Sequence, residues 1–478
     1  MQSSLAVILY LVFLAIGAVL LKRRRPEASA ALWLPQLWFM ISASRPVYLW
    51  IYSEPVVQKE LDSLSGNPVD RAILSVLLAL GLIILLRRNI NWRGAVSGNK
   101  WVFALFLFMG ASILWSDYPA VSFKRWVRSA GDLVMVLIVL SEKRPLEAIG
   151  TLVLRLSVVL LPLSIILIKY FPHLGVAYTS DGLSTMWIGV TTHKNELGVL
   201  ALICGIFLFW KMLEAWRNRK VEYLDITLML MVFWLLRGST TSDSKTSTVA
   251  FLLSCCILLS LHVLRPGPRL VGGLIAGTLT LFGVFIALNA ITEGLADASL
   301  YENLVRATGR DPTLTGRTDL WKDLIGYAAE NPVLGRGYGS FWVGNLSYLW
   351  DKFIWLPTQA HNGYLDVVLE LGIIGLLLLF GAILSAYRSI IRHFERDASF
   401  AGLRLVFFIM ILVHNMTESS FLRGSSYLWD VFLLFAVTPL AQRSALPQTV
   451  LRPAAVKETA TAGRGARQPF VRGRRSLS

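Results

Sequence analysis

The sequence predicts an all-α polytopic membrane protein, a bundle of about 13 transmembrane helices with one large, partly helical external loop. Three observations predict this fold class. The chain is 55% hydrophobic and only 16% charged, whereas soluble proteins carry about a quarter charged residues. Apolar runs of about 20 residues, each long enough to cross a bilayer core, recur from one end of the chain to the other. Basic residues concentrate in alternate short loops, as they do on the cytoplasmic side of membrane proteins.

The apolar runs leave no interval large enough for a separate soluble domain. We therefore predict one integral membrane domain over residues 1–442, with an external loop at about 292–363. Residues 443–478 are rich in Arg, Ala, Gly and Ser, and we expect a disordered basic tail near anionic lipid. The runs that predict the spans are 3–21, 31–52, 71–86, 101–115, 120–140, 148–171, 197–213, 225–241, 246–264, 270–291, 364–386, 403–420 and 427–442.

The loops between the spans predict the orientation. Because an odd number of spans separates the two termini, basic loops on the cytoplasmic side place the N-terminus outside and the C-terminus inside. The first run is followed by basic residues rather than preceded by them, which is the reverse of a cleaved signal peptide, so we expect a span there. The basic loops lie at 22–25, 87–100, 143–144, 211–220, 265–269 and 388–396.

The net charge of +16 is explained by these loops, and not by nucleic-acid binding. The sequence contains no RNA-binding motif and no basic helix away from a membrane flank, so we expect no nucleic-acid partner. Cys204, Cys255 and Cys256 all lie in apolar runs. No C-x-x-C or His/Cys spacing indicates a metal site, and we expect neither metal nor cofactor.

The long external loop is too long for a simple connector, and its composition is not that of a disordered segment. We expect a short amphipathic helix at 318–329, ended by Asn331-Pro332. Aromatic side chains supply enough apolar surface for the loop to fold back over the membrane face. They are Trp321, Tyr327, Tyr338, Phe341, Trp342, Tyr348, Trp350, Phe353 and Trp355.

Two arginines of this loop are candidate ligands for an anion. Arg317 follows a glycine at the start of the predicted helix, where its guanidinium can bind a pair of anionic oxygens. Taken alone, its spacing favours a local pair with Asp319 or Asp323. Arg336 lies in a glycine-rich turn at 331–339, which permits close approach of backbone N–H groups but as an isolated motif is better explained by structure.

His361 lies where the long loop re-enters the membrane, before Asn362-Gly363 and a span that carries Glu370. A neutral imidazole at this boundary can take a proton from an incoming hydroxyl. An isolated histidine here could equally cap the following helix or contact lipid headgroups. A second histidine motif, His193-Lys194-Asn195, also stands just before a span.

Further polar residues lie at predicted external ends of spans. Cations at this depth are costly and tend to mark substrate paths, although snorkelling to headgroups explains some of them. Taken together with the two histidines, they favour an anionic, lipid-linked substrate. They are Arg125 and Arg128 on one helical face, Arg237 and Lys245 at a turn, and His414, Asn415 and Glu418, a patch that interhelical hydrogen bonding also explains.

In these motifs the chain resembles the O-antigen ligase and polymerase superfamily, and most of all its ExoQ-type branch of exopolysaccharide production proteins. The matching residues follow the family's order over about residues 100–420. They are Trp115-Ser116, His193-Lys194-Asn195, Ser244-Lys245-Thr246, Gly316-Arg317 with Trp321, Asn331-Pro332 with Gly335 and Gly337, and His361-Asn362 with Leu365, Glu370-Leu371-Gly372 and Gly375.

The resemblance implies a multi-pass glycosyltransferase of the bacterial inner membrane, which acts at the periplasmic face without a nucleotide sugar or a metal. An acceptor hydroxyl would attack the anomeric carbon of an oligosaccharide held on undecaprenyl diphosphate. The family's loop histidine maps onto His361, which would activate the acceptor, and its loop arginine onto Arg317, which would stabilise the leaving diphosphate. A further family arginine is replaced by Lys245, and Lys supplies charge without the bidentate fork, so Arg237 would share this role.

The remaining candidates receive supporting roles in this interpretation. Arg125 and Arg128 join Lys245 and Arg237 in binding the diphosphate, and the supporting residues are His193, Lys194, Asn195, Asn362, Arg336 and Glu370. Expected partners are the lipid-linked oligosaccharide, membrane lipid, and a chain-length regulator and a flippase of the export pathway.

The leading hypothesis is a polymerase that joins lipid-linked repeat units into an exopolysaccharide. A ligase that transfers a finished glycan from the same donor to lipid A-core uses the same donor chemistry, and the residues around His361 do not separate the two. A lipid-linked sugar transporter is the alternative from another class. The sequence lacks the internal repeat and the matching pair of broken spans that transporters tend to have.

Overall fold

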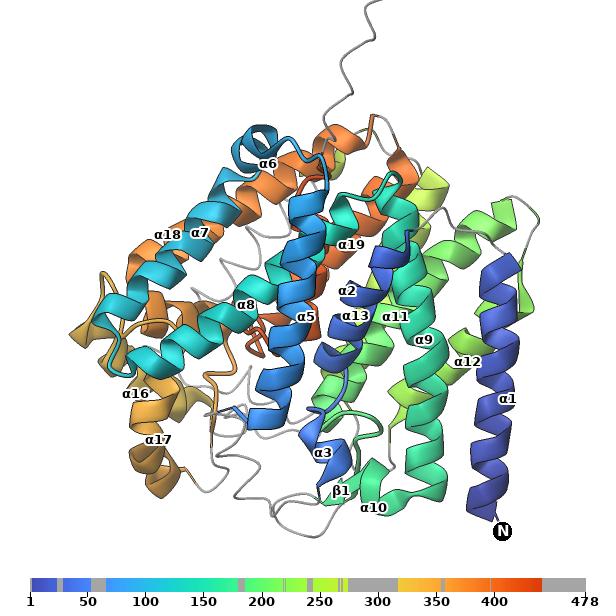
Figure 1. Cartoon of the computed structure of the whole chain (residues 1–478), viewed down its shortest axis with the longest axis horizontal. Coiled ribbons are helices and arrows are strands. Elements are labelled where there is room, and N and C mark those ends of the chain that lie inside the picture. The colour runs from blue at the N-terminus through green and yellow to red at the C-terminus, as the bar shows by residue number, and fades with distance from the viewer. Residues whose placement is uncertain are drawn as a thin grey trace, which may run out of the picture. The chain divides into compact units, whose positions relative to one another are not determined.

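The computed structural model describes residues 2–23, 29–52, 66–178, 185–217, 219, 221–238, 244–264, 267, 270–273, 317–353, 357–395 and 397–440. Nearly all of the regular structure in these ranges is helical, which confirms the all-α polytopic membrane class (Figure 1). Most of the predicted span at 270–291, the first part of the external loop and the basic tail at 443–478 lie outside the described residues.

The helices of the first half are α1 (Gln2–Arg23), α2 (Trp33–Ser42), α3 (Tyr48–Ile51), α5 (Pro68–Arg87), α6 (Trp92–Gly98), α7 (Lys100–Ala111), α8 (Pro119–Leu140), α9 (Pro145–Tyr170) and α10 (Pro172–Gly175), with short 3₁₀ turns at Ala30–Leu32 and Ser112–Trp115. Strands β1 (Val176–Tyr178) and β2 (Thr185–Trp187) pair antiparallel. The helices of the second half are α11 (Lys194–Arg217), α12 (Tyr223–Arg237), α13 (Lys245–Leu264), α16 (Arg317–Glu330), α17 (Phe341–Lys352), α18 (Gly363–His393), α19 (Ala398–His414) and α20 (Tyr427–Ala436).

Among the described residues, six helices are long and apolar enough to cross a membrane, namely α1, α5, α9, α11, α13 and α18. The pair α6–α7, bent by 89°, makes a seventh if it counts as one span. Seven of the 13 predicted spans are thus matched, the span at 270–291 lies mostly outside the described residues, and the other five differ for two physical reasons. Helices α2, α12, α19 and α20 are too short to span alone. Helix α8 is long enough, but it carries Lys124, Arg125, Arg128 and Asp132.

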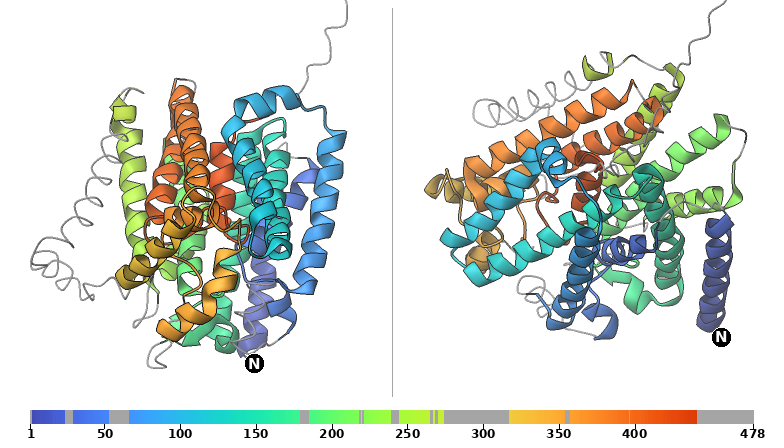
Figure 2. Two further views of the ribbon diagram at one scale, coloured as in Figure 1. Left: turned by 90° about the vertical axis from the view of Figure 1, so that its left-hand side faces the viewer. Right: turned by 45° about the horizontal axis from the view of Figure 1, so that its top comes forward.

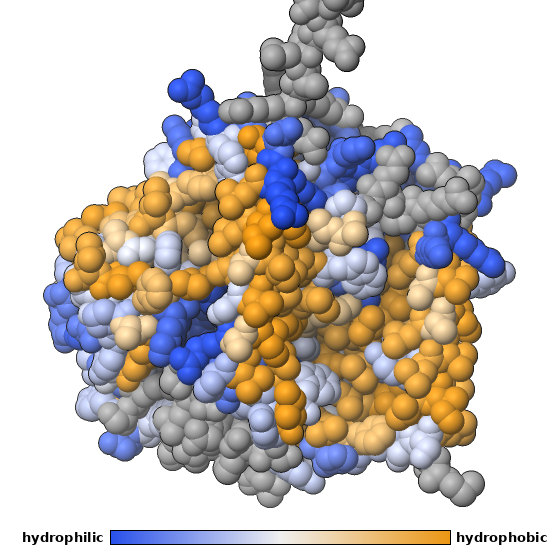
Figure 3. All heavy atoms as spheres, in the orientation of Figure 1, coloured by the Kyte–Doolittle hydropathy of each residue, from blue (hydrophilic) through white to orange (hydrophobic). Residues whose placement is uncertain are grey.

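The long helices stand side by side with their axes roughly aligned (Figure 2). Apolar side chains form a wide band over the face drawn in Figure 3, with hydrophilic residues gathered at its upper edge. Large apolar residues of the spans are exposed, among them Leu9 of α1, Leu86 of α5 and Leu107 of α7. Exposed apolar surface on this scale is expected of helices that face lipid rather than water.

The end of the external loop folds into a small apolar core of its own. Helix α16 covers the predicted amphipathic segment, and α17 follows it. The two helices bury a cluster separate from the core of the bundle, which contains Leu320, Leu324, Phe341, Trp342, Leu349, Phe353, Ala360 and Leu369. Phe341, Trp342 and Phe353 therefore serve to fold this part of the loop, and Trp321, Tyr327 and Trp350 pack against the same cluster.

A kink in α18 attaches this small core to the bundle. Gly372 has a φ of 62°, so the helix breaks there and leaves backbone groups without helical partners. The turn that follows α16 supplies them, with Ile373 N donating to Pro332 O at 2.9 Å and Gly337 N to Glu370 O at 2.9 Å. A Cβ added at Gly372 would lie 2.2 Å from Val333 O. Glycine is required here both by its backbone angle and by the space available.

Replacing Gly372 with alanine should therefore destabilise the folded protein by roughly 2 kcal/mol or more, because it combines a left-handed backbone with a clash against the backbone. The measurement is the midpoint of thermal unfolding in detergent. Gly326→Ala is the matched control, since this helical glycine has nothing within 4 Å of an added Cβ, and alanine should be neutral or stabilising there. Equal midpoints for the two variants would contradict the assigned role of the kink.

Candidate functional site

Four polar side chains from three segments of the chain meet at the carboxylate of Glu418. The Nδ1 atom of His361 lies 2.9 Å from Oε2, and Gln359 Nε2 donates to the same oxygen at 3.3 Å. Arg317 Nη2 lies 3.1 Å from Oε1, and Asn195 Nδ2 donates to that oxygen at 3.0 Å. The Glu418 side chain is only 12% exposed, so this carboxylate joins the cluster in a largely dry environment.

His361 is held in one orientation by the start of α18. Its φ of 50° places it in the left-handed region, which is uncommon for a residue with a side chain. The next residue, Asn362, caps the helix, because its side-chain oxygen accepts from Tyr364 N at 3.1 Å and Leu365 N at 3.2 Å. Asn362 N in turn donates to Ser419 Oγ at 3.1 Å, next to Glu418. The backbone before α18 is thus tied to the loop that carries the carboxylate.

Arg317 lies at the first position of α16 and reaches the same loop. Besides its contact with Glu418, its Nη1 donates to the carbonyl of Thr417. The nearby acidic residues have other partners: Asp323 pairs with Lys352 at 2.6 Å, and Asp319 lies 3.8 Å from Lys322. The long-range pair with Glu418 therefore takes the place of the local pair that spacing alone favours.

The loop after α19, which carries Glu418, is shaped by Asn415. The Asn415 side-chain oxygen accepts from the backbone of Ser420 at 2.9 Å and Phe421 at 3.0 Å. Its backbone oxygen accepts from Gly363 N at 2.7 Å. A Cβ added at Gly363 would lie 2.1 Å from the Asn415 side chain, so the first residue of α18 must be glycine for the two segments to approach. These contacts hold Glu418 beside His361.

Glu418 is ionised at neutral pH. Burial raises the pKa of this carboxyl, but the hydrogen bond and charge of His361 and the charge of Arg317 outweigh that effect and lower it to about 2. An ionised carboxylate carries no proton, so the hydrogen bond between the two groups requires Nδ1–H of His361 as the donor. In a neutral imidazole, Nε2 is then the nitrogen that can accept a proton.

The segment before α11 brings the second histidine motif to the same place. Asn195 binds Glu418, and the backbone N–H of Asn195 donates to His193 Nδ1 at 3.2 Å. The charges of Glu418 and His361 both act on His193, which shows that it lies close to them. Lys194 lines a small pocket with Trp187 and Ser244, among other residues, beside the cluster.

The start of α13 lies next to this segment. Gly198 of α11 packs against Ser244 and Ser247, since an added Cβ would lie 2.5 Å from Ser247 Oγ. Lys245 begins α13 at this contact, and the structure does not describe its side chain. Arg237 ends α12 with an exposed side chain, and residues 239–243 between the two helices lie outside the described part. No contact between Arg237 or Lys245 and Glu418 is among the described interactions.

The other predicted cations hold loops to the bundle. Arg125 Nη1 donates to Gly339 O at 2.5 Å, and Arg128 Nε donates to Gly424 O at 2.7 Å. Arg336 forms ion pairs with Glu330 and with Asp117, the latter at 3.5 Å. The carboxylate of Glu370 accepts a hydrogen bond from the backbone of Gly339, and the Glu370 carbonyl oxygen accepts one from Gly337 N. Their roles toward a diphosphate or in support of the site stay predictions, and their described contacts are with protein groups other than Glu418.

Among the described residues, no group of three or more His, Cys, Asp or Glu side chains is arranged to hold a metal ion. The donors around Glu418 instead combine one basic imidazole, one guanidinium and two amides. Such a set suits proton transfer from a hydroxyl next to the binding of an anion.

Comparison with known proteins shows what a chain with this site resembles. Residues 230–380 match the O-antigen ligase family, and this segment contains both Arg317 and His361. Asn195 and Glu418, which complete the cluster, lie outside the matched segment.

Curated relatives agree with this resemblance. The chain is 26% identical over 301 residues to the exopolysaccharide production protein ExoQ of Rhizobium meliloti, which covers 62% of this chain and 66% of that protein. It is 26% identical over 221 residues to a putative polysaccharide ligase of Rickettsia bellii, covering 44% and 50% of the two chains. A putative polysaccharide ligase of Rickettsia felis is 24% identical over 375 residues, which cover 74% of this chain and 84% of that protein. The matches thus span just under two thirds of ExoQ and half of the Rickettsia bellii protein.

Sequence reasoning missed the residue that organises this site. The sequence places Glu418, with His414 and Asn415, in a polar patch that interhelical hydrogen bonding also explains, and it does not single out Gln359. A signal was available, because Glu418 is an acidic residue near the end of the apolar run 403–420, on the predicted external side where the histidine and arginine motifs also lie. A cation cluster at a membrane boundary needs a counter-charge when it is buried.

Proposed function

We propose that this protein is an exopolysaccharide polymerase, which joins undecaprenyl-diphosphate-linked repeat units at the periplasmic face of the inner membrane. The observation that carries the proposal is that one ionised carboxylate, Glu418, holds both His361 and Arg317. A proton acceptor and an anion-binding group are thereby placed side by side. This pair of functions is what glycosyl transfer from a lipid diphosphate requires.

The reaction replaces one C–O bond with another and transfers one proton. The acceptor hydroxyl attacks the anomeric carbon of the donor sugar, its proton passes to Nε2 of His361, and a new glycosidic C–O bond forms. The bond between the anomeric carbon and the diphosphate oxygen breaks, and undecaprenyl diphosphate leaves with the bonding electron pair. General base assistance of this kind contributes about 10²- to 10⁴-fold to the rate.

Arg317 stabilises the negative charge that develops on the leaving diphosphate. Its guanidinium has five N–H donors, and its described contacts with Glu418 and Thr417 involve its two Nη atoms. The same contacts fix the position of the guanidinium before substrate binds, so little reorganisation is needed during the reaction. Lys245, Arg237, Arg125 and Arg128 remain further candidates for the diphosphate.

Glu418 acts as a positioning residue. It accepts the Nδ1 proton of His361, which fixes the tautomer, and its charge stabilises the imidazolium that forms when Nε2 takes the acceptor's proton. Asn195 and Gln359 satisfy the same carboxylate and limit its rotation. A carboxylate in this role changes the rate without contacting the sugar.

The placement of the cluster supports action at the outer surface of the inner membrane. His361 precedes α18, Arg317 begins α16, Asn195 begins α11 and Glu418 follows α19, so the cluster lies at one end of the bundle. The basic residues at the end of α5, between α8 and α9, and at the end of α18 lie at the other ends of their helices. By the distribution of basic loops, that second end is cytoplasmic, with the C-terminus on that side and the N-terminus periplasmic.

A ligase that transfers a finished glycan to lipid A-core is the second candidate. The matched family is described as O-antigen ligase, and the Rickettsia relatives carry the name putative polysaccharide ligase. The name of ExoQ, an exopolysaccharide production protein, favours the polymerase. Both reactions use the same donor and the same residues, and they differ in the acceptor.

Deleting the gene, restoring it, and sizing the surface and secreted polysaccharide would test the proposal. For a polymerase, the deletion should leave single lipid-linked repeat units and no long polymer, and the restored gene should recover the polymer. Long lipid-linked polymer that never reaches lipopolysaccharide would instead identify the ligase. Unchanged polysaccharide after deletion would exclude both and leave the lipid-linked sugar transporter to be tested.

A further inference from the structure

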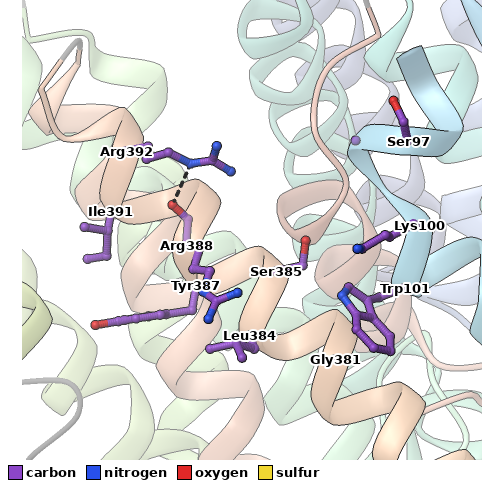
Figure 4. A pocket seen from close by; sticks show the side chains of 11 residues that line it. Ser97, Lys100, Trp101, Gly381, Leu384, Ser385, Tyr387, Arg388, Ile391 and Arg392 are labelled. Carbon is purple, nitrogen blue, oxygen red and sulfur yellow. Dashed lines mark hydrogen bonds between the residues drawn. The ribbon is translucent and has the colours of Figure 1, made fainter. Parts of the chain in front are cut away.

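A cavity of about 670 Å³ lies between α7 and α18, at the end of α18 opposite to His361. Ser97 precedes α7, and Lys100 and Trp101 begin that helix, while Ser385 and Arg388 come from the last turns of α18 (Figure 4). Polar groups of the two helices thus border one opening. The cavity is separate from the cluster around Glu418, because none of its lining residues contacts that cluster.

Three cations line the cavity without a carboxylate partner among the described residues. Lys100 comes from α7, and Arg388 and Arg392 lie one turn apart on α18. Arg392 Nε donates to the carbonyl of Arg388 at 3.2 Å, and the Lys100 ammonium lies 5.7 Å from the Trp101 ring centre. Neither contact neutralises a charge, so the three positive charges face the cavity or its rim unopposed. Such an arrangement attracts a group with several anionic oxygens.

The wall of the cavity continues into an apolar surface along the same helices. Trp101 packs on Gly381, where an added Cβ would lie 2.4 Å from the indole. Leu384 lines the cavity and is 46% exposed, and Leu377, two turns earlier on the same face of α18, is 61% exposed. An occupant with a charged head and a long apolar part would therefore match both regions. A soluble phosphate compound would leave the apolar part uncovered.

We propose that this cavity binds one anionic phospholipid of the membrane leaflet on that side, with its phosphate among Lys100, Arg388 and Arg392 and an acyl chain along α7 and α18. The charges explain the choice of an anionic lipid, and the position at the ends of spans explains the choice of a lipid. Scattered cations that only snorkel to headgroups would not converge from two helices on one cavity. The inference is independent of the proposed glycosyl transfer.

The test uses the full-length protein in neutral detergent, with phosphatidylglycerol, phosphatidylcholine or glycerol phosphate added. Phosphatidylglycerol should raise the thermal midpoint in a saturable manner, and phosphatidylcholine and glycerol phosphate should not. The combined variant Lys100→Gln, Arg388→Gln, Arg392→Gln should bind phosphatidylglycerol at least about tenfold more weakly. The control variant Arg87→Gln, Arg93→Gln, Lys143→Gln removes the same charge from exposed sites outside the cavity and should retain the affinity.

A second variant protects the test against loss of folding. Ser385→Phe fills part of the cavity without altering any charge, and it should also weaken phosphatidylglycerol binding. Equal affinity in the charge variant and its control would overturn the proposal, as would an equal response to phosphatidylcholine. A response to glycerol phosphate as large as that to phosphatidylglycerol would show a site for soluble phosphates, and not for a lipid.

Discussion

Replacing His361 with alanine should reduce polymer formation by about 10²- to 10⁴-fold while the protein remains folded in the membrane, because the acceptor hydroxyl loses its base. The measurement is the rate of chain extension on lipid-linked repeat units by the purified protein, together with the size of polysaccharide in cells that carry the variant. Protein levels in the membrane should match the wild type. The residual rate should come from substrate binding and the charge of Arg317.

The matched control is His173→Ala. His173 lies in α10, is exposed, and has its ring contact with Phe171 rather than with Glu418. Its replacement should leave the rate unchanged. A full rate in His361→Ala, or equal losses in the two variants, would remove His361 from the mechanism. Polymer that persists in His361→Ala but disappears in the deletion strain would point to another base, with His193 the first to test because it lies close to the same carboxylate.

Replacing Glu418 with glutamine should lower the turnover number by about 10- to 100-fold, with less effect on the acceptor's KM. Glutamine keeps the size of the side chain and can still accept one hydrogen bond, but it removes the charge that stabilises the imidazolium and holds Arg317. Steady-state rates over a range of acceptor concentrations separate the two constants. Glu142→Gln is the control, since Glu142 is a buried acid whose ion pair with Arg88 lies at the other end of the bundle.

A double-mutant cycle distinguishes positioning from a merely structural role. If Glu418 acts through His361, the combined variant Glu418→Gln, His361→Ala should be no slower than His361→Ala alone. Two independent losses would multiply instead, and that result would place Glu418 outside the catalytic unit. A general loss of stability in Glu418→Gln would appear as a lower thermal midpoint. If the loss of a buried ion pair is the cause, Glu142→Gln should lower the midpoint to a similar degree.

Much of the fold follows from local sequence. Runs of apolar residues identify the membrane helices because a bilayer demands about 20 such residues for each span. The amphipathic pattern that ends at Asn331-Pro332 predicts α16 to within a residue or two. Among the described residues, fewer helices are long and apolar enough to cross a membrane than the apolar runs predict, because such a run indicates burial as readily as a full crossing. Helix α20, with ten residues, is buried along its whole length and is too short to cross alone.

The separate motifs around His193, Arg317 and His361 are also visible in the sequence, and their order carries the resemblance to the superfamily. The resemblance suggests their chemistry, because an isolated histidine or arginine at a membrane boundary can also cap a helix, pair locally or contact lipid headgroups. Local spacing was less informative about partners. For Arg317 it favours a neighbouring aspartate, but the structure places those aspartates against lysines and gives the arginine to Glu418.

The sequence by itself therefore determined the class of protein, its membrane helices and the residue types available for chemistry. Only the tertiary structure decided which of them meet. Glu418 is separated from His361 by 57 residues, from Arg317 by 101 and from Asn195 by 223. Contacts over such distances depend on how α11, α16, α18 and α19 pack, and no local periodicity encodes that packing. The same packing turned Arg125 and Arg128 toward backbone carbonyls, because a buried cation takes the acceptors that its own surroundings supply.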